Sequence, residues 1–148
     1  MPKKSKQILR VLDVNFNRCK EGLRVVEDVF RFVLEDDNLR KQTRRLRHKL
    51  DFIARKETFQ DAILSRDSKR DLGKKSDYLE NKRENLISIL YINFQRVKES
   101  LRVLEEFLKL VSLTQVSAIK KIRYEIYILE QKAFKFRPPL RNLRQKDN

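Results

Sequence analysis

The sequence contains little of what builds tight turns, disulfides or membrane spans. Its 148 residues include two glycines, three prolines and one cysteine. So little glycine and proline favours long, uninterrupted helices over a fold rich in turns. One cysteine cannot form a disulfide within the chain. The apolar runs are too short for a transmembrane helix, and MPKKSKQ at the start has no apolar stretch behind its charges. We therefore expect a cytoplasmic protein without a signal peptide or membrane segment.

The charge is strongly one-sided. Hydrophobic residues make up 40% of the chain and charged residues 39%, with a net charge of +15. That balance is typical of a soluble helical protein rather than a disordered one. The positive field attracts polyanions, which include nucleic acid, an acidic membrane surface and small phosphorylated ligands. Taken alone, the charge favours nucleic acid.

One stretch of fourteen residues occurs twice. NFNRCKEGLRVVED, residues 15 to 28, returns as NFQRVKESLRVLEE, residues 93 to 106, with nine identical positions. A second pair, LRHKL (46 to 50) and IRYEI (122 to 126), follows at nearly the same spacing. So close an internal match predicts two copies of one structural unit.

Apolar residues recur every three or four positions in both copies, which predicts helices. In the first copy this seam consists of Leu9, Leu12, Phe16, Cys19, Leu23, Val26, Phe30 and Val33, and in the second of Ile87, Leu90, Phe94, Val97, Leu101, Leu104, Leu108 and Val111. We expect four long helices, at about 6–34, 39–57, 77–111 and 115–136. Asp37 or Asn38 would cap the second, Ser76 or Asp77 the third, and Thr114 the fourth.

These elements predict an all-α bundle of two helical hairpins related by an internal pseudo-two-fold axis. If the long helices pack antiparallel on their seams, they cross near Glu21 and Glu99. The whole chain, 1–148, would be one domain. Its copies span about 8–57 and 86–134, with a polar loop at 65–76 between them and flexible basic tails at 1–5 and 138–148.

A second apolar stripe runs beside each seam and is interrupted at its middle. The interruption is Asn15, Arg18 and Gly22 in the first copy, and Asn93, Arg96 and Ser100 in the second. A missing side chain beside polar groups predicts a notch that could hold a ligand, and a glycine inside a helix costs about 1 kcal/mol relative to alanine. Close helix packing at Gly22, and structural pairing of the asparagines and arginines, are the competing interpretations.

A charged stripe that includes Glu21 and Glu99 runs next to that notch. Acids and bases three or four residues apart can hold one another's side chains, so this stripe could orient Arg18 and Arg96 toward a phosphate. A solvated helix face would look much the same.

The loop SRDSKRDLG holds the other candidate residues. Asp67 and Asp71 lie four residues apart among cations, with Arg66 before them and Gly73 after them. Two carboxylates among cations could hold Mg²⁺ while the cations take phosphates. An ordinary charged linker is the alternative. The sequence has no Walker loop, GxGxxG, HExxH or Cys/His metal motif, so a nucleotide would use none of the common cradles.

In this order, LDVNFNRCKEGLRVVEDVFRFVL, LRHKL, SRDSKRDLG, NFQRVKESLRVLEEFLKL and IRYEIYILE resemble a small all-helical family of hydroxymethylpyrimidine phosphate kinases. That family occurs alone or fused ahead of thiamine-phosphate synthase, and the resemblance covers about residues 8 to 130. It implies that this chain, in the stand-alone form, phosphorylates 4-amino-5-hydroxymethyl-2-methylpyrimidine phosphate to its diphosphate with ATP and Mg²⁺, for thiamine synthesis. Cys19, where a small residue such as alanine is expected, and the basic Ser68-Lys69-Arg70 depart modestly from the family pattern.

Joined to the residue patterns, the resemblance yields a site hypothesis. The notch would hold the small phosphorylated pyrimidine, with Asn15 or Asn93 on its ring and Arg18 or Arg96 on its phosphate. The catalytic candidates are Arg66, Asp67 and Asp71, and the last two would contact the metal. Nucleotide phosphates would meet Arg47, Arg123 and Gly73, beside Arg66. One site per chain is expected unless the protein forms a homo-oligomer.

Two other functions stay open from the residues. A basic helical protein could bind RNA along its second helix and tails, although few aromatic residues are available to stack bases. Because both substrates of the kinase reaction carry phosphate, the resemblance disfavours nucleic acid. The second alternative is a chorismate mutase-like helical enzyme, which would need neither ATP nor metal.

Overall fold

The protein is an all-helical bundle, as the sequence predicts. The computed structural model describes residues 5–76 and 82–135. Its elements in chain order are α1 (Lys6–Asp28), the π-helix η1 (Val29–Val33), α2 (Asp37–Ala54), α3 (Glu57–Leu64), the 3₁₀ turns η2 (Ser68–Arg70) and η3 (Leu72–Lys74), α5 (Leu86–Leu108) and α6 (Leu113–Phe134). The described residues contain no strand, and none of their helices is long and apolar enough to cross a membrane.

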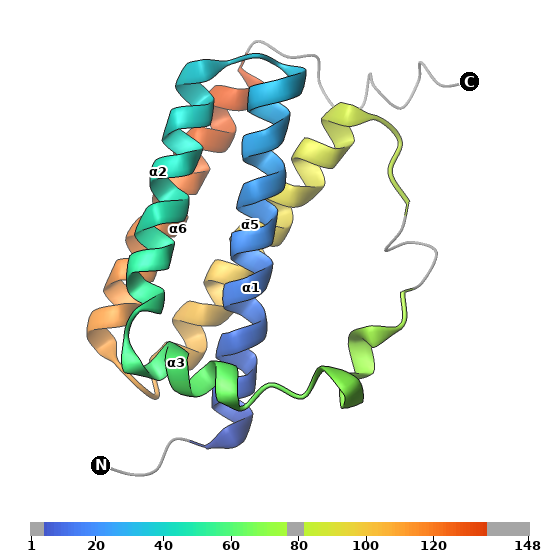
Figure 1. Ribbon diagram of the computed structural model, residues 1–148. Coiled ribbons are helices and arrows are strands. Elements are labelled where there is room, and N and C mark those ends of the chain that lie inside the picture. The colour runs from blue at the N-terminus through green and yellow to red at the C-terminus, as the bar shows by residue number, and fades with distance from the viewer. Residues whose placement is uncertain (1–4, 77–81, 136–148) are drawn as a thin grey trace.

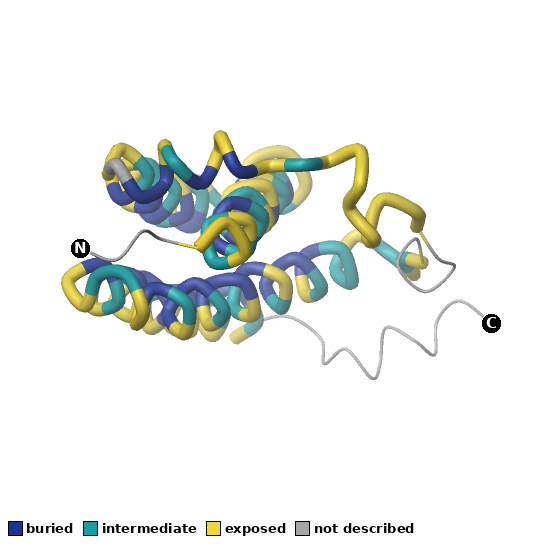
Figure 2. The backbone as a smooth tube through the Cα atoms, turned by 90° about the horizontal axis from the view of Figure 1, so that it is seen from below, coloured by how far each residue is buried: buried dark blue, intermediate teal, exposed yellow. Residues whose placement is uncertain are grey.

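Two antiparallel helical hairpins build the bundle. Figure 1 shows α1 paired with α2 and α5 paired with α6, and α5 crosses α1 at an angle. The most extensive interface joins α1 to α5, while α2 also packs on α6 and α3 packs on α1. The buried positions lie on the inward sides of the helices, and the connection at 65–76 is mostly exposed (Figure 2).

The predicted seams form the core. From Leu12 to Phe30 and from Leu90 to Leu108 nearly every seam residue is fully buried, and Phe16 is half-buried against Phe59 of α3. The seam ends are partly exposed, most of all Val33 at 41%. At about 25 cal/mol per Å², burying one such apolar side chain contributes roughly 1.5–3 kcal/mol, so this single core is the main source of stability.

The helix crossing lies where the repeat predicts it. A Cβ placed on Gly22 would stand 2.7 Å from Cγ2 of Val97, and Cys19 hydrogen-bonds with Ser100. These antiparallel contacts lie on either side of Glu21 and Glu99, the predicted crossing point. The exact two-fold relation between the hairpins stays a prediction.

Several predicted helix boundaries were wrong, and at the N-terminal ends the reason is that a different side chain caps the helix. Asp36 caps α2, where its side chain accepts a hydrogen bond from Leu39 N, and Ser112 rather than Thr114 caps α6. The third long helix begins at Leu86, not 77, because Asn85 and Ser88 form a reciprocal capping box. The helices end at Ala54, Leu108 and Phe134, two or three residues before the predicted ends.

Besides the four expected long helices, the structure contains the eight-residue helix α3, which begins at Glu57 and ends at Leu64, before the polar loop. Residues 1–4, 77–81 and 136–148, and with them most of both predicted tails, lie outside the described residues. Ser5 belongs to the fold, because its side chain accepts a hydrogen bond from Ile8 N and caps α1.

Candidate active site on the first long helix

Three polar side chains share one face of α1 near its start. Asp13, Asn17 and Glu21 are spaced by four residues, which places them one above another along a helix. Asp13 is only 5% exposed, although an ionised carboxylate is costly to bury without a partner. Asn17 Nδ2 donates to Asp13 Oδ1 at 3.5 Å, a long contact that cannot by itself satisfy the carboxylate. A cation must therefore complete this site.

Arg66, just after α3, is that cation. Its Nε and Nη2 donate to the two carboxylate oxygens of Asp13, each at 2.7 Å. This bidentate geometry is the strongest way in which arginine pairs with a carboxylate. The hydrogen bonds to Asp13, and at longer range the charge of Glu21, raise the pKa of Arg66. The predicted catalytic Arg66 therefore lies against α1, within electrostatic range of the predicted Glu21.

Sequence reasoning missed Asp13. The signal that could have found it is the charged stripe itself: continued one turn toward the N-terminus from Asn17, the same spacing reaches Asp13. Its partner lies 53 residues further on, and no local pattern joins the two.

The predicted metal residues follow Arg66 along the chain, at the starts of two short turns. Asp67 Oδ1 accepts from Arg70 N at 3.3 Å, and Asp71 Oδ1 accepts from Gly73 N at 2.7 Å. Each carboxylate caps its own 3₁₀ turn with one oxygen. The other oxygen of Asp67 faces Arg70 Nε at 3.8 Å, whereas Asp71 is exposed. Within the described part of the chain, no group of three or more histidine, cysteine or acidic residues is arranged to hold a metal ion.

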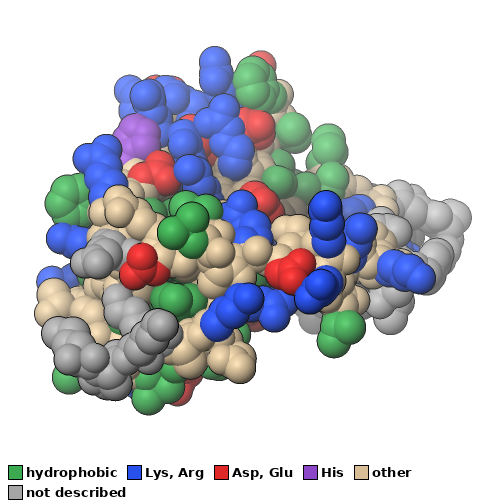
Figure 3. All heavy atoms as spheres, turned by 60° about the horizontal axis from the view of Figure 1, so that its bottom comes forward, with side chains coloured by type: hydrophobic (Ala, Val, Ile, Leu, Met, Phe, Trp, Pro, Cys, Tyr) green, Lys and Arg blue, Asp and Glu red, His purple; other side chains and the backbone are tan. Residues whose placement is uncertain are grey.

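Figure 3 shows the lower end of the bundle, where lysine and arginine side chains surround a few carboxylates. Arg18 and Arg96 are both exposed, and neither forms an ion pair with a described residue. Glu21 and Glu99 are exposed as well. These four predicted residues are therefore accessible to a ligand, and Arg18 is on the same helix as Asp13.

The predicted notch is filled by protein. Val97 occupies the space beside Gly22, so the glycine permits the close crossing of α1 and α5. Asn15 and Asn93 are 3% and 7% exposed. Each donates its side-chain amide to the carbonyl one turn earlier in its own helix, at 2.9 Å to Val11 and 2.8 Å to Ile89. The prediction that these residues line an open pocket is corrected by this packing.

Arg47 and Arg123, predicted to bind nucleotide phosphates, already have partners inside the fold. Arg47 Nε donates to Glu27 at 2.9 Å, and Arg123 pairs through Nε and Nη2 with Glu105. Glu27 and Glu105 are 4% and 3% exposed. The same buried pair thus joins the helices of each hairpin. The hydrogen bond to Glu105 is also the main cause of a raised pKa for Arg123.

Comparison with known proteins matches the order of these motifs to one family. The model of the ThiD2 family matches residues 10–132, which include α1, the Arg66 loop and α5. The chain belongs to the ThiD2 family. No solved structure matches it.

The curated relatives are longer proteins. The chain is 39% identical over 124 residues to a thiamine-phosphate synthase of Nostoc punctiforme, which covers 83% of this chain and 34% of that protein. It is 37% identical over 147 residues to a thiamine-phosphate synthase of Thermosynechococcus vestitus, and this match covers 94% of this chain and 38% of that protein. The chain therefore spans about a third of the length of the curated relatives it matches.

Proposed function

We propose that this ThiD2-family protein acts in thiamine biosynthesis, as the ATP-dependent kinase that converts 4-amino-5-hydroxymethyl-2-methylpyrimidine phosphate into its diphosphate. The names of its relatives support the pathway. The observation that carries the proposal is the Asp13–Arg66 pair, which anchors the start of the loop that carries Asp67 and Asp71 to α1, the helix of Arg18 and Glu21.

Phosphoryl transfer to this acceptor requires charge neutralisation more than it requires a general base. The terminal phosphoryl group of ATP passes to a phosphate oxygen of the pyrimidine substrate, the bond to the bridging oxygen breaks, and ADP leaves. The accepting phosphate is largely ionised at neutral pH, because its second pKa is near 6. Phosphoryl transfer then depends on positioning and on cations around the phosphates.

Arg18 and Arg66 supply those cations in our proposal. Arg66 uses Nε and Nη2 on Asp13, which leaves its Nη1 free to donate to a phosphate. Asp13 thereby acts as a positioning residue for Arg66. Arg18 would bind the substrate phosphate, and Glu21 or Asn17 would accept from or donate to the amino-pyrimidine ring in place of the buried Asn15 and Asn93.

The two loop carboxylates fit Mg²⁺ only as a partial ligand set. Mg²⁺ commonly binds one or two carboxylates and takes its remaining ligands from phosphates and water. Asp71 is exposed and has one oxygen not used in capping, whereas Asp67 is partly exposed and its second oxygen lies 3.8 Å from Arg70 Nε, which a bound ion would displace. When bound, the ion would neutralise charge on the phosphates. In our proposal Asp67 and Asp71 hold it near Arg66.

The test is ADP release from ATP with the pyrimidine phosphate as acceptor. Arg66→Gln and Asp67→Asn should each lower kcat/KM by about 100-fold, as loss of one charge-stabilising group does in other enzymes. Lys120→Gln, an exposed cation of α6, is the matched control and should keep wild-type activity. Circular dichroism and the Tm establish that each variant folds.

If the wild-type protein released no ADP in response to the pyrimidine phosphate, the kinase proposal would be refuted. So would release that survives unchanged in both Arg66→Gln and Asp67→Asn. If the protein instead bound RNA with a steep salt dependence and no turnover, the basic surface would be the functional feature.

A further inference from the structure

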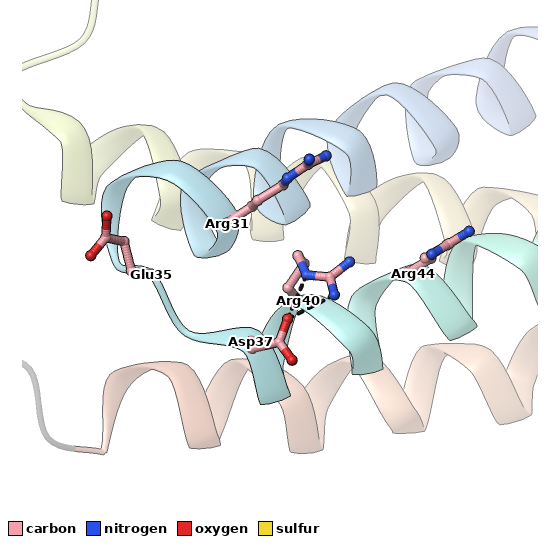
Figure 4. Close-up of a pocket in the computed structure, with 5 residues that line it drawn as sticks. All are labelled: Arg31, Glu35, Asp37, Arg40 and Arg44. Atoms are coloured by element: carbon pink, nitrogen blue, oxygen red, sulfur yellow. Dashed lines mark hydrogen bonds and ion pairs between the residues drawn. The ribbon is translucent and has the colours of Figure 1, made fainter.

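A second group of arginines lies at the other end of the bundle. A hollow of about 560 Å³ between η1 and the start of α2 is lined by Arg31, Glu35, Asp37, Arg40 and Arg44. In Figure 4 the side chains of Arg31, Arg40 and Arg44 point in one direction, whereas Glu35 points away from them. Eighteen residues separate Arg31 from Asp13 along the first helix, which is roughly 25 Å at 1.5 Å per residue. This hollow is therefore distinct from the candidate active site.

Backbone geometry removes the acid that would otherwise neutralise Arg31. In a regular α-helix, Glu35 would lie one turn after Arg31 and could pair with it. The helix instead changes to the π-helix Val29–Val33, and Glu35 has a φ of 51°, in the left-handed region. Arg31 is left over the ring of Phe32, 4.7 Å from its centroid, with no carboxylate within ion-pair distance among the described residues. π-Helical turns often mark functional sites.

Arg44 has only cations and a histidine as helical neighbours. One turn before it are Arg40 and Lys41, and one turn after it are Arg47 and His48. Like charges at this spacing repel, and within the described chain Arg44 forms no ion pair that offsets the repulsion. An anion bound in the hollow would relieve it.

Asp37 holds the third arginine in place. Arg40 Nε and Nη2 donate to Asp37 Oδ1 at 2.9 and 2.7 Å, and Lys41 Nζ lies 3.0 Å from the other oxygen. One carboxylate is thus shared by two cations, and Arg40 keeps its Nη1 free. The hollow retains a positive excess on planar guanidinium donors, of which Arg40 is held in place by Asp37, and such donors favour phosphate over a diffuse polyanion.

We propose that this hollow binds the phosphate chain of a diphosphate or triphosphate, at a site separate from the Arg66 site. Arg44 and Arg31 contact the phosphates, and Arg40, oriented by Asp37, completes the cluster. Free pyrophosphate and a nucleoside polyphosphate share this chemistry. The proposal does not depend on the kinase reaction.

Isothermal titration calorimetry of the whole chain with inorganic pyrophosphate, without divalent metal, tests the site. Arg44→Gln should weaken binding at least about tenfold, because it removes charge-assisted hydrogen bonds to the phosphates. Arg31→Gln, outside α2, should weaken it similarly. The matched control is Arg55→Gln, an exposed arginine at the other end of α2, which removes the same charge and should change the affinity less than twofold. Pyrophosphate should raise the Tm of the wild type and of Arg55→Gln, but not of Arg44→Gln.

Further titrations distinguish pyrophosphate from a nucleotide as the ligand, and the hollow from the Arg66 site as the binding site. ATP that binds as tightly as pyrophosphate identifies the phosphate chain as the whole ligand, whereas tighter ATP binding adds contacts to the base or sugar. Both results support the site. If Arg44→Gln and Arg55→Gln lost the same amount of affinity for pyrophosphate, net charge alone would explain the binding and the proposal would be overturned. A loss in Arg66→Gln but not in Arg44→Gln would move the anion to α1. Tighter binding of a single-stranded RNA that uses Arg44 and Arg55 alike would also overturn it.

Discussion

Arg66 donates two hydrogen bonds of 2.7 Å to Asp13, from Nε to Oδ2 and from Nη2 to Oδ1. The pair joins the end of α3 to the start of α1 and positions the loop that follows. Asp13 is nearly buried, whereas the side chain of Arg66 is 43% exposed. Substitutions of Asp13 and of Arg66 should therefore lower the unfolding free energy by different amounts.

Arg66→Gln should therefore destabilise the protein more than Asp13→Asn. The first change leaves a buried carboxylate without its cation, while the second removes that charge and keeps a similar shape. Solvent screening of the half-exposed guanidinium limits the coupling between the residues to about 1 kcal/mol. Urea unfolding of both single variants and the double variant measures this coupling. Equal losses in the two single variants would contradict the asymmetry.

Gly22→Ala should destabilise the helix crossing by about 1 kcal/mol or more, although alanine is the better helix former. The added Cβ would stand 2.7 Å from Cγ2 of Val97, a stiff and fully buried side chain. Val97→Ala in the same chain should recover part of the loss, because the two changes then exchange volume. Gly73→Ala is the control, since its Cβ would be 3.3 Å from Asp71 Oδ1 on an exposed turn. Thermal and urea unfolding provide the comparison, and a stabilised Gly22→Ala would show that the helices separate easily.

Glu105→Gln should cost about 3 kcal/mol in unfolding free energy, because it leaves the guanidinium of Arg123 buried without its partner. The side chains of Arg123 and Glu105 are 10% and 3% exposed. The next residue supplies a matched control. Glu106 is exposed and pairs only with Arg102 and Lys109 on its own helix, so Glu106→Gln should not change stability measurably. Similar effects of the two changes in chemical denaturation would contradict a structural role for the buried pair.

Alkaline pH should unfold the protein partly through Cys19. Burial raises the pKa of this thiol from 9.0 to about 12, and the hydrogen bond with Ser100 opposes the shift only in part. In the unfolded chain the thiol loses its proton near pH 9, so between about pH 9 and 12 the native state binds more protons and its stability falls as the pH rises. Unfolding free energies measured across this range should fall less steeply in Cys19→Ala. The native thiol should also resist a thiol reagent at pH 8 until the protein is denatured, and rapid native labelling would contradict its burial.

The sequence was a good guide to the helices and their buried faces, because periodicity acts within one helix. Leu12, Leu23, Phe94 and Leu104 are fully buried, as the seams predict. The boundaries were harder to predict, because several polar residues compete to cap each end and the better geometry of Asp36, Ser112 and the Asn85–Ser88 box decides among them. The π-helix at Val29–Val33 has no pattern that distinguishes it from a regular last turn.

The candidate site was predicted in part, because local spacing identifies chemical types but not their partners. Arg66 and Glu21 were selected and lie near each other, while Asp13 was overlooked. Arg47 and Arg123 looked as available as Arg18, yet buried glutamates of the neighbouring helix hold both of them.

By itself, the sequence determined that this chain forms long helices and where the apolar face of each one lies, since helical periodicity is a property of neighbouring residues. The repeat even located the crossing near Glu21 and Glu99. Only the tertiary structure decided that Val97 fills the space beside Gly22, and that Asp13 meets Arg66 across 53 residues. It also left Arg31 and Arg44, at the far end of the bundle, without an ion-pair partner among the described residues. Those outcomes depend on the approach of separate helices, because the free energy of a buried charge or a missing side chain is set by whatever the fold places beside it.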